Sequence, residues 1–360
     1  MKANLARALA LMISGPGLAL VLSLALAGPA AADISGLFEM TVPVADNSSA
    51  TRSAAARQAM ALALIRITGD RGAASAASTA RLRSGAERYV QQFVYERVTN
   101  DAPEHAFDLR FVFDANALTD GIKQAGYSVW GRQRPGLLVW LYVDAADTTG
   151  FIGPAGDVAP EIAADLARQA GLRGLPLKLP LLDLEELRVV TPEAIAASRM
   201  DQIMQASAMY DTAGVLAGVL TQQGPNLWSI AWRMNINGAR SAWTADVDDP
   251  RLALGSGINA AADVLARSYA PRGMLAVADG VEMAISGVNS LDDYARAVTY
   301  LDSLDAVTDL QVKRVVPGSI ALRVTVTGGG VNLDRLLALG AVVRPLPGEP
   351  GRYQLVPGAL

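Results

Sequence analysis

The chain has 360 residues, of which 51% are hydrophobic and 18% are charged, and this balance excludes a disordered chain because it allows a large apolar core. The 31 Lys and Arg residues against 35 Asp and Glu residues give a net charge of −4, which argues against a nucleic acid partner. No Cys and a single His are present, so disulfides and cysteine nucleophiles are excluded, and we expect neither a metal site nor a cofactor.

The N-terminal segment, residues 1–32, has the pattern of a signal peptide. Lys2 and Arg7 precede an apolar stretch that is densest at 18–26, and Ala30 and Ala32 supply the small residues that a signal peptidase requires. We therefore expect cleavage after Ala32 and export to the bacterial periplasm. The alternative is an uncleaved membrane anchor, because the uncharged stretch is nearly long enough to span a bilayer. No later window is apolar enough for a transmembrane helix.

The rest of the chain divides into three small units, 33–131, 136–270 and 272–360, each mixing helices and strands. The predicted fold class is therefore α+β or α/β. The element order predicts βαββαβ, ferredoxin-like units at the two ends and an α/β sandwich with a mixed sheet in the middle.

In the first unit, residues 37–44 and 106–114 alternate apolar and polar side chains, which predicts two strands. A cap at Ser48 or Ser49 begins an Ala-rich helix that runs to about Thr68 and stops at Gly69. The other expected elements are a helix near 79–89, a strand at 92–99, a helix at 115–125 and a short strand at 127–130.

The middle unit begins with residues 137–143, a continuously apolar run that is typical of a strand covered on both faces. The other expected elements are a helix at 161–170, a strand at 175–182, a helix at 191–210, strands at 213–221, 227–235 and 240–246, and a helix at 256–269.

In the third unit, a strand at 281–285 precedes a helix capped by Ser290, whose inner face we expect to hold Leu291, Tyr294, Val298 and Leu301. The other expected elements are a hairpin that turns at 317–318 with alternating residues in its second arm, a helix at 332–339 and a final strand pair near 342 and 353.

Several local strings resemble an exported proteobacterial family, the domain of unknown function 2066. They are RITGD at 66–70, RYVQQ at 88–92, VWGRQRP at 129–135 and LPLLD at 179–183. The family has no assigned activity, so the resemblance implies location and fold but no catalytic residue. The order of elements in the middle unit is also similar to the N-terminal domain of the Tol–Pal β-propeller protein, which is an analogy of fold alone.

The sequence features that could indicate catalysis or nucleotide binding are better explained without either function. His105 lies in a turn beside acidic residues, but no nucleophile motif accompanies it, so we interpret it as a polar loop residue. Residues 255–260 fit the pattern G-x-G-x-x-A, yet a turn rather than a strand precedes them, which argues against a dinucleotide site. No Gly is followed by Lys, so a P-loop is excluded.

Asp183, Glu185 and Glu186 gather after the expected strand at 175–182, where α/β folds place ligands. As paired carboxylates they are the alternative ligand-binding or hydrolytic site. The competing interpretation is a solvated helix start, because acidic residues there favour the helix dipole.

Trp130, Arg132 and Arg134 form the candidate partner-binding segment, because Trp and Arg are enriched at interaction hot spots. The competing interpretation is structural: a Trp between two units packs the seam, and the arginines bind local groups.

The sequence thus favours an exported, non-enzymatic interaction or assembly module of the bacterial envelope, with a partner protein in that compartment. The alternatives are a carboxylate-dependent envelope hydrolase and a carrier of a small molecule or glycan.

Overall fold

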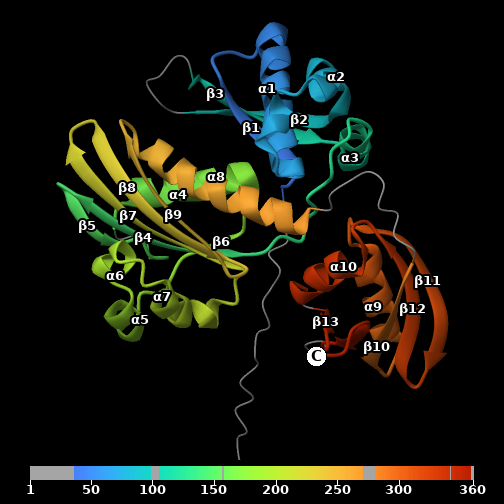
Figure 1. Cartoon of the computed structure of the whole chain (residues 1–360). Helices are drawn as coiled ribbons and strands as arrows, with labels where there is room; N and C mark the ends of the chain where they lie inside the picture. Colours follow the sequence, from blue (N-terminus) through green and yellow to red (C-terminus); the bar gives the residue numbers. More distant parts are fainter. Residues whose placement is uncertain (1–35, 99–104, 156–157, 271–279, 341, 358–360) are drawn as a thin grey trace, which may run out of the picture.

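The computed structural model describes residues 36–98, 105–155, 158–270, 280–340 and 342–357 (Figure 1). Within them the chain folds into three α/β units, each with its own sheet, as the sequence predicts. The predicted signal peptide, with its cleavage residues Ala30 and Ala32, lies outside the described residues. None of the described helices combines the length and apolar character needed to cross a membrane.

The first unit packs helices on one face of a three-stranded antiparallel sheet in the order β1-β3-β2. Its main elements are β1 (Glu39–Val44), α1 (Ser49–Thr68), α2 (Ala80–Ser84), β2 (Val90–Arg97), β3 (Phe107–Phe113) and α3 (Ala115–Gln124). The hydroxyl of Ser48 caps α1 by accepting from the N–H of Thr51 at 3.2 Å, and Gly69 ends the helix with φ 71°. The predicted alternation in β3 is confirmed, since Leu109, Phe111 and Phe113 are buried.

The strand predicted at 127–130 does not form, so this unit has three strands where a ferredoxin-like unit has four. The reason is that the backbone of this segment binds a helix end instead of a neighbouring strand. The N–H of Trp130 donates to the carbonyl of Ile67, in the last turn of α1, at 2.7 Å. The segment therefore leads the chain along the end of α1 toward the middle unit.

The middle unit is a three-layer sandwich around a mixed sheet in the order β5-β4-β7-β8-β9. Its strands are β4 (Leu137–Ala145), β5 (Thr148–Phe151), β6 (Leu177–Lys178), β7 (Gly214–Gly224), β8 (Leu227–Ile236) and β9 (Ala239–Val247). Its helices are α4 (Pro160–Arg173), α5 (Leu184–Val189), α6 (Pro192–Ala196), α7 (Met200–Ser207) and α8 (Pro250–Tyr269). β4 pairs in parallel with β7 and with the short β6, and the other pairs are antiparallel.

The apolar run of β4 is covered on both faces, as predicted. Leu137 and Val139 pack in the core shared with α4 and α8, whereas Leu138 and Trp140 pack in the core shared with α6 and α7. The single helix predicted at 191–210 is instead divided into α6 and α7. Ser198 between them has φ 56°, a left-handed conformation that cannot continue a helix.

The third unit has a five-stranded sheet in the order β11-β12-β10-β14-β13. Its elements are β10 (Val281–Val288), α9 (Leu291–Asp302), β11 (Val307–Val316), β12 (Gly318–Val326), α10 (Gly329–Ala338), β13 (Val343–Pro345) and β14 (Arg352–Leu355). Ser290 caps α9 as predicted, and the alternating residues of β12 are buried. β14 inserts between β10 and β13 and pairs in parallel with β10, a departure from the antiparallel ferredoxin-like sheet.

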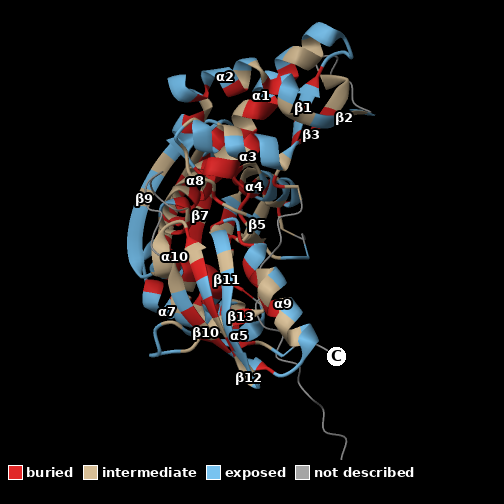
Figure 2. Cartoon of the chain, turned by 90° about the vertical axis from the view of Figure 1, so that its right-hand side faces the viewer, coloured by how far each residue is buried: buried red, intermediate tan, exposed pale blue. Residues whose placement is uncertain are grey.

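The inner face predicted for α9 is wrong at its first position. Leu301 is fully buried and Tyr294 packs at the edge of the core, but the side chain of Leu291 is 85% exposed. Figure 2 shows that buried residues run through the interior of each unit, while the outward surface of α9 is largely exposed.

Candidate functional site

The connector between the first two units is anchored by the buried side chains of Trp130 and Arg134, each only 1% exposed. The guanidinium of Arg134 donates to the carbonyl oxygens of Arg66 and Trp130, both at 2.7 Å, and to that of Gly131 at 3.0 Å. It also donates to the carbonyls of Arg173 at 2.9 Å and Gly174 at 3.1 Å. Because Arg66 and Arg173 lie in the last turns of α1 and α4, one side chain caps both helices.

Arg66, Arg134 and Arg173 lie close together where the first two units meet. Burial, and next the nearby positive charges of Arg66 and Arg173, lower the pKa of Arg134 to about 9. Burial likewise lowers the pKa of Arg66 to about 10. Arg66 and Arg134 donate to backbone carbonyl oxygens, which offset the cost of burying their charges, and Arg173 donates to Asp263 as well as to the carbonyl of Gly69.

This placement favours the structural interpretation for two members of the candidate segment. Trp130 and Arg134 present no free surface to a partner protein. Arg132 is exposed, and its backbone N–H donates to a carboxylate oxygen of Asp305 in the third unit at 3.0 Å. A partner-binding role thus stays a prediction for the Arg132 side chain.

The three acidic residues at 183–186 do not converge on a common point. Asp183 and Glu186 form the capping box of α5, in which Glu186 accepts from the backbone N–H of Leu182 at 2.7 Å and Asp183 at 3.2 Å. The other carboxylate oxygen of Glu186 accepts from the Tyr210 hydroxyl. Glu185 is exposed and pairs with Arg188. The helix-start interpretation is favoured, because two of the carboxylates already bind backbone groups.

The remaining sequence motifs also have structural explanations. His105 pairs with Asp108 at 2.7 Å at the surface. The glycines at 255 and 257 lie inside α8, and a Cβ on Gly257 would come within 2.5 Å of the Trp232 ring. In the parts of the chain that the structure describes, no group of three His, Cys, Asp or Glu residues is placed to hold a metal ion.

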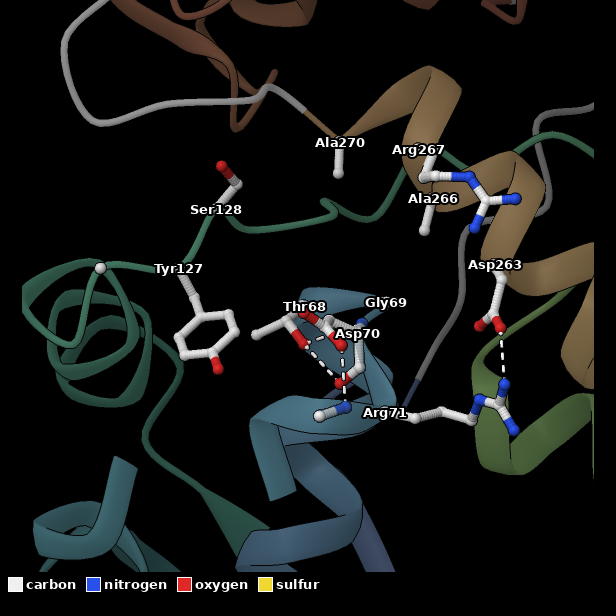
Figure 3. Close-up of a pocket in the computed structure, with 12 residues that line it drawn as sticks. Thr68, Gly69, Asp70, Arg71, Tyr127, Ser128, Asp263, Ala266, Arg267 and Ala270 are labelled. Atoms are coloured by element: carbon white, nitrogen blue, oxygen red, sulfur yellow. Dashed lines mark hydrogen bonds and ion pairs between the residues drawn. The ribbon is translucent and has the colours of Figure 1, made fainter. Parts of the chain in front are cut away.

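A hollow lies where the first two units meet, and we call it the junction pocket (Figure 3). It has a volume of about 620 Å³. Residues 68–72, from the last residue of α1 onward, form its floor; Tyr127 and Ser128 lie on one side, and the last turns of α8 form the other side. Apart from the end of the RITGD string in its floor, no sequence motif marks it, because the α8 wall comes more than 190 residues after the floor.

Hydrogen bonds fix the floor and the α8 wall of the junction pocket. Asp70 accepts from the N–H of Gly72 at 2.8 Å, which holds the turn. Arg71 and Arg173 both donate to Asp263 on α8, at 2.9 and 2.8 Å. Gly69 has no room for a side chain, since a Cβ there would lie 2.4 Å from Ala266. The RITGD string at 66–70 thus serves the contact between α1 and α8.

The third unit has a separate apolar hollow, which we call the C-terminal groove. It has a volume of about 540 Å³ and lies between the start of α9 and the turn that joins β11 to β12. Leu291, Val315 and Val316 line it with side chains that are 85%, 58% and 37% exposed.

A search of curated proteins found no match. Solved structures match parts of the chain, among them a competence-damaged protein (CinA) superfamily protein from Enterobacter cloacae, with 14% identity over 36% of this chain and 82% of that one and a TM-score of 0.20. Another is lipoprotein GNA1162 from Neisseria meningitidis, with 17% identity over 32% of this chain and 81% of that one and a TM-score of 0.20.

The comparison with protein families gives a firmer result for the first unit. The family whose model matches is not the domain of unknown function 2066 that the local strings resemble, and the match covers the first unit alone. Residues 31–131 are similar to a domain of unknown function, DUF8605.

Proposed function

We propose that the protein is an exported, non-catalytic assembly module of the bacterial envelope, and that it self-associates through the C-terminal groove. The observation that carries the proposal is the exposure of Leu291, Val315 and Val316 around one concavity. Apolar side chains gathered in this way are typical of protein interaction sites, because water contact with them is unfavourable and a partner removes it.

The proposed location rests on the N-terminal sequence. The charged start, the apolar stretch and the exit at Ala30 and Ala32 support export, as does the resemblance of the local strings to the domain of unknown function 2066. An envelope protein distinct from this chain is the other candidate for the groove.

Charge favours a second copy of this chain as the occupant. Asp292 follows Leu291 on one side of the groove, while Lys313 and Arg314 precede Val315 on the other. A two-fold axis through the groove would set the acidic side of one copy against the basic side of the other. Apolar contact at the centre and opposite charges at the rim would then stabilise the same dimer.

The use of the acidic residues argues against the hydrolase alternative. Glu186 is bound to the Leu182 and Asp183 N–H groups and to the Tyr210 hydroxyl, and Glu185 points to solvent with Arg188. Retaining and inverting glycosidases need two carboxylates that face each other across the bond to be cleaved.

The test is the mass of the purified protein by light scattering at about 100 μM, well above the Kd of a ~1 μM dimer. We expect a dimer, and a monomer for the double variant Leu291→Glu and Val315→Glu. The matched control is Leu184→Glu on α5, because Leu184 is 87% exposed and lies outside the groove. It should remain dimeric.

Two outcomes would overturn self-association. One is a wild-type chain that is monomeric at this concentration, in which case crosslinking from Leu291 in intact cells to a different envelope protein would assign the groove to that protein. The other is a dimer that persists in the double variant with an unchanged melting temperature.

A further inference from the structure

The junction pocket has one unpaired charge of each sign. Asp263 is occupied by Arg71 and by Arg173, so these three groups form a closed cluster. Asp70 and Arg267 also line the pocket, and neither forms an ion pair with any residue that the structure describes.

The two unpaired charges come from different walls. Asp70 belongs to the turn after α1, and Arg267 belongs to the last turn of α8 (Figure 3). Only one carboxylate oxygen of Asp70 is used within the turn, where it accepts from the N–H of Gly72. The other oxygen is available to a donor.

Neutral polar groups and an apolar surface complete the lining. Tyr127 and Ser128 also line the pocket. Ala266 and Ala270 give the α8 wall short apolar side chains, which leave room beside it. The pocket volume of about 620 Å³ lies in the range typical of small-molecule sites.

We propose that the junction pocket binds a small zwitterion, a free amino acid or a short peptide. Its ammonium group pairs with Asp70 and its carboxylate pairs with Arg267. A simple anion would meet the negative charge of Asp70, and a simple cation would meet the positive charges of Arg71 and Arg267. A ligand with both charges satisfies both walls, and charge-assisted hydrogen bonds are the stronger kind.

The experiment titrates the whole purified protein with the dipeptide L-alanyl-L-alanine by calorimetry. Two analogues serve as probes of the ends: N-acetyl-L-alanyl-L-alanine, which lacks the ammonium, and L-alanyl-L-alaninamide, which lacks the carboxylate. We expect the dipeptide to bind and each analogue to bind about tenfold more weakly or worse, the loss expected for one charge-assisted contact.

Two variants assign each end of the ligand to its wall. Asp70→Asn keeps a side chain that can cap the turn. This variant should lose only the preference for the dipeptide over the acetylated analogue and should keep the preference over the amide. Arg267→Gln should lose only the preference for the dipeptide over the amide. Asp120→Asn and Arg57→Gln, both exposed and outside the pocket, are the matched controls and should keep both preferences.

The proposal fails if the dipeptide does not bind at about 10 mM, a concentration at which even a weak ~1 mM site is mostly filled. It also fails if the folded variants bind the three probes as the wild type does. Because the C-terminal groove is untouched by these variants, the mass of the assembly reports on the proposed function separately.

Discussion

The guanidinium carbon of Arg134 lies 4.2 Å from the centre of the Trp130 ring, so that the cation stacks on an aromatic face four residues earlier in the chain. The same guanidinium reaches carbonyl oxygens at the ends of α1 and α4. Two residues of the connector thus join two units that the sequence presents as separate.

Arg134→Ala should destabilise the protein by about 3–5 kcal/mol, because it leaves several buried carbonyl oxygens without a donor. Urea unfolding measures the change. Arg132→Ala is the matched control two residues away, and its exposed side chain should contribute at most about 0.5 kcal/mol. Equal stability of the two variants would contradict the shared helix cap.

Gly257→Ala should destabilise the middle unit by about 1–3 kcal/mol, because the new methyl group would overlap the Trp232 ring and force the helix or the ring to move. Thermal unfolding followed by Trp fluorescence checks this. The control is Gly171→Ala in α4, where a Cβ meets no atom within 4 Å and the helix should gain about 0.4–1 kcal/mol. A neutral result at Gly257 would argue against the tight contact of α8 with β8.

Stability should fall between pH 10 and 12 in part through Tyr210. Burial, and next the hydrogen bond to Glu186, raise the pKa of Tyr210 from 10.0 to about 12. The folded state therefore holds this proton more tightly than the unfolded state, so the contribution is complete below pH 10 and is lost as the pH rises through 12.

Tyr210→Phe lacks the ionisable hydroxyl and isolates that contribution from those of the other tyrosines. Its melting temperature should be lower than that of the wild type at pH 8 and should decline less steeply from pH 10 to 12. Parallel pH profiles for the two proteins would show that the hydroxyl does not stabilise the fold.

Export should release a chain that begins at Asp33. N-terminal sequencing of protein from the periplasmic fraction reads the first residue directly. Ala30→Asp together with Ala32→Asp should block cleavage, since the peptidase accepts only small residues there, and precursor should accumulate. A mature protein that retains Met1 would rule the cleavage out.

The sequence predicted the positions of the helices and strands better than the contacts between them. Local patterns sufficed for β3, β4 and β12 and for the caps at Ser48 and Ser290, because each depends on neighbouring residues. One failure has a distant cause: the strand expected at 127–130 is absent because the N–H of Trp130 binds the end of α1. The break between α6 and α7 is local, at the left-handed backbone of Ser198, and Leu291 is exposed at the first position of α9.

The candidate sites divide in the same way. Asp183 and Glu186 fit a helix start, which the alternative interpretation of the sequence already contained. The junction pocket could not be predicted, because Asp70 and Arg267 line it from two different units and no spacing rule connects them. The end of the RITGD string lies in the floor of the pocket, but the sequence predicted only that the helix stops at Gly69.

The shared cap at Arg134 sets the mechanical behaviour of the molecule. Sliding or rotation of the first unit against the second would separate the Arg134 guanidinium from carbonyl oxygens of both units. Because Arg134 is buried, water could not replace these hydrogen bonds, so even small displacements are unfavourable. We therefore expect the first two units to move together. If they do, the separation of the two walls of the junction pocket stays fixed, and the proposed zwitterion would be selected by its length.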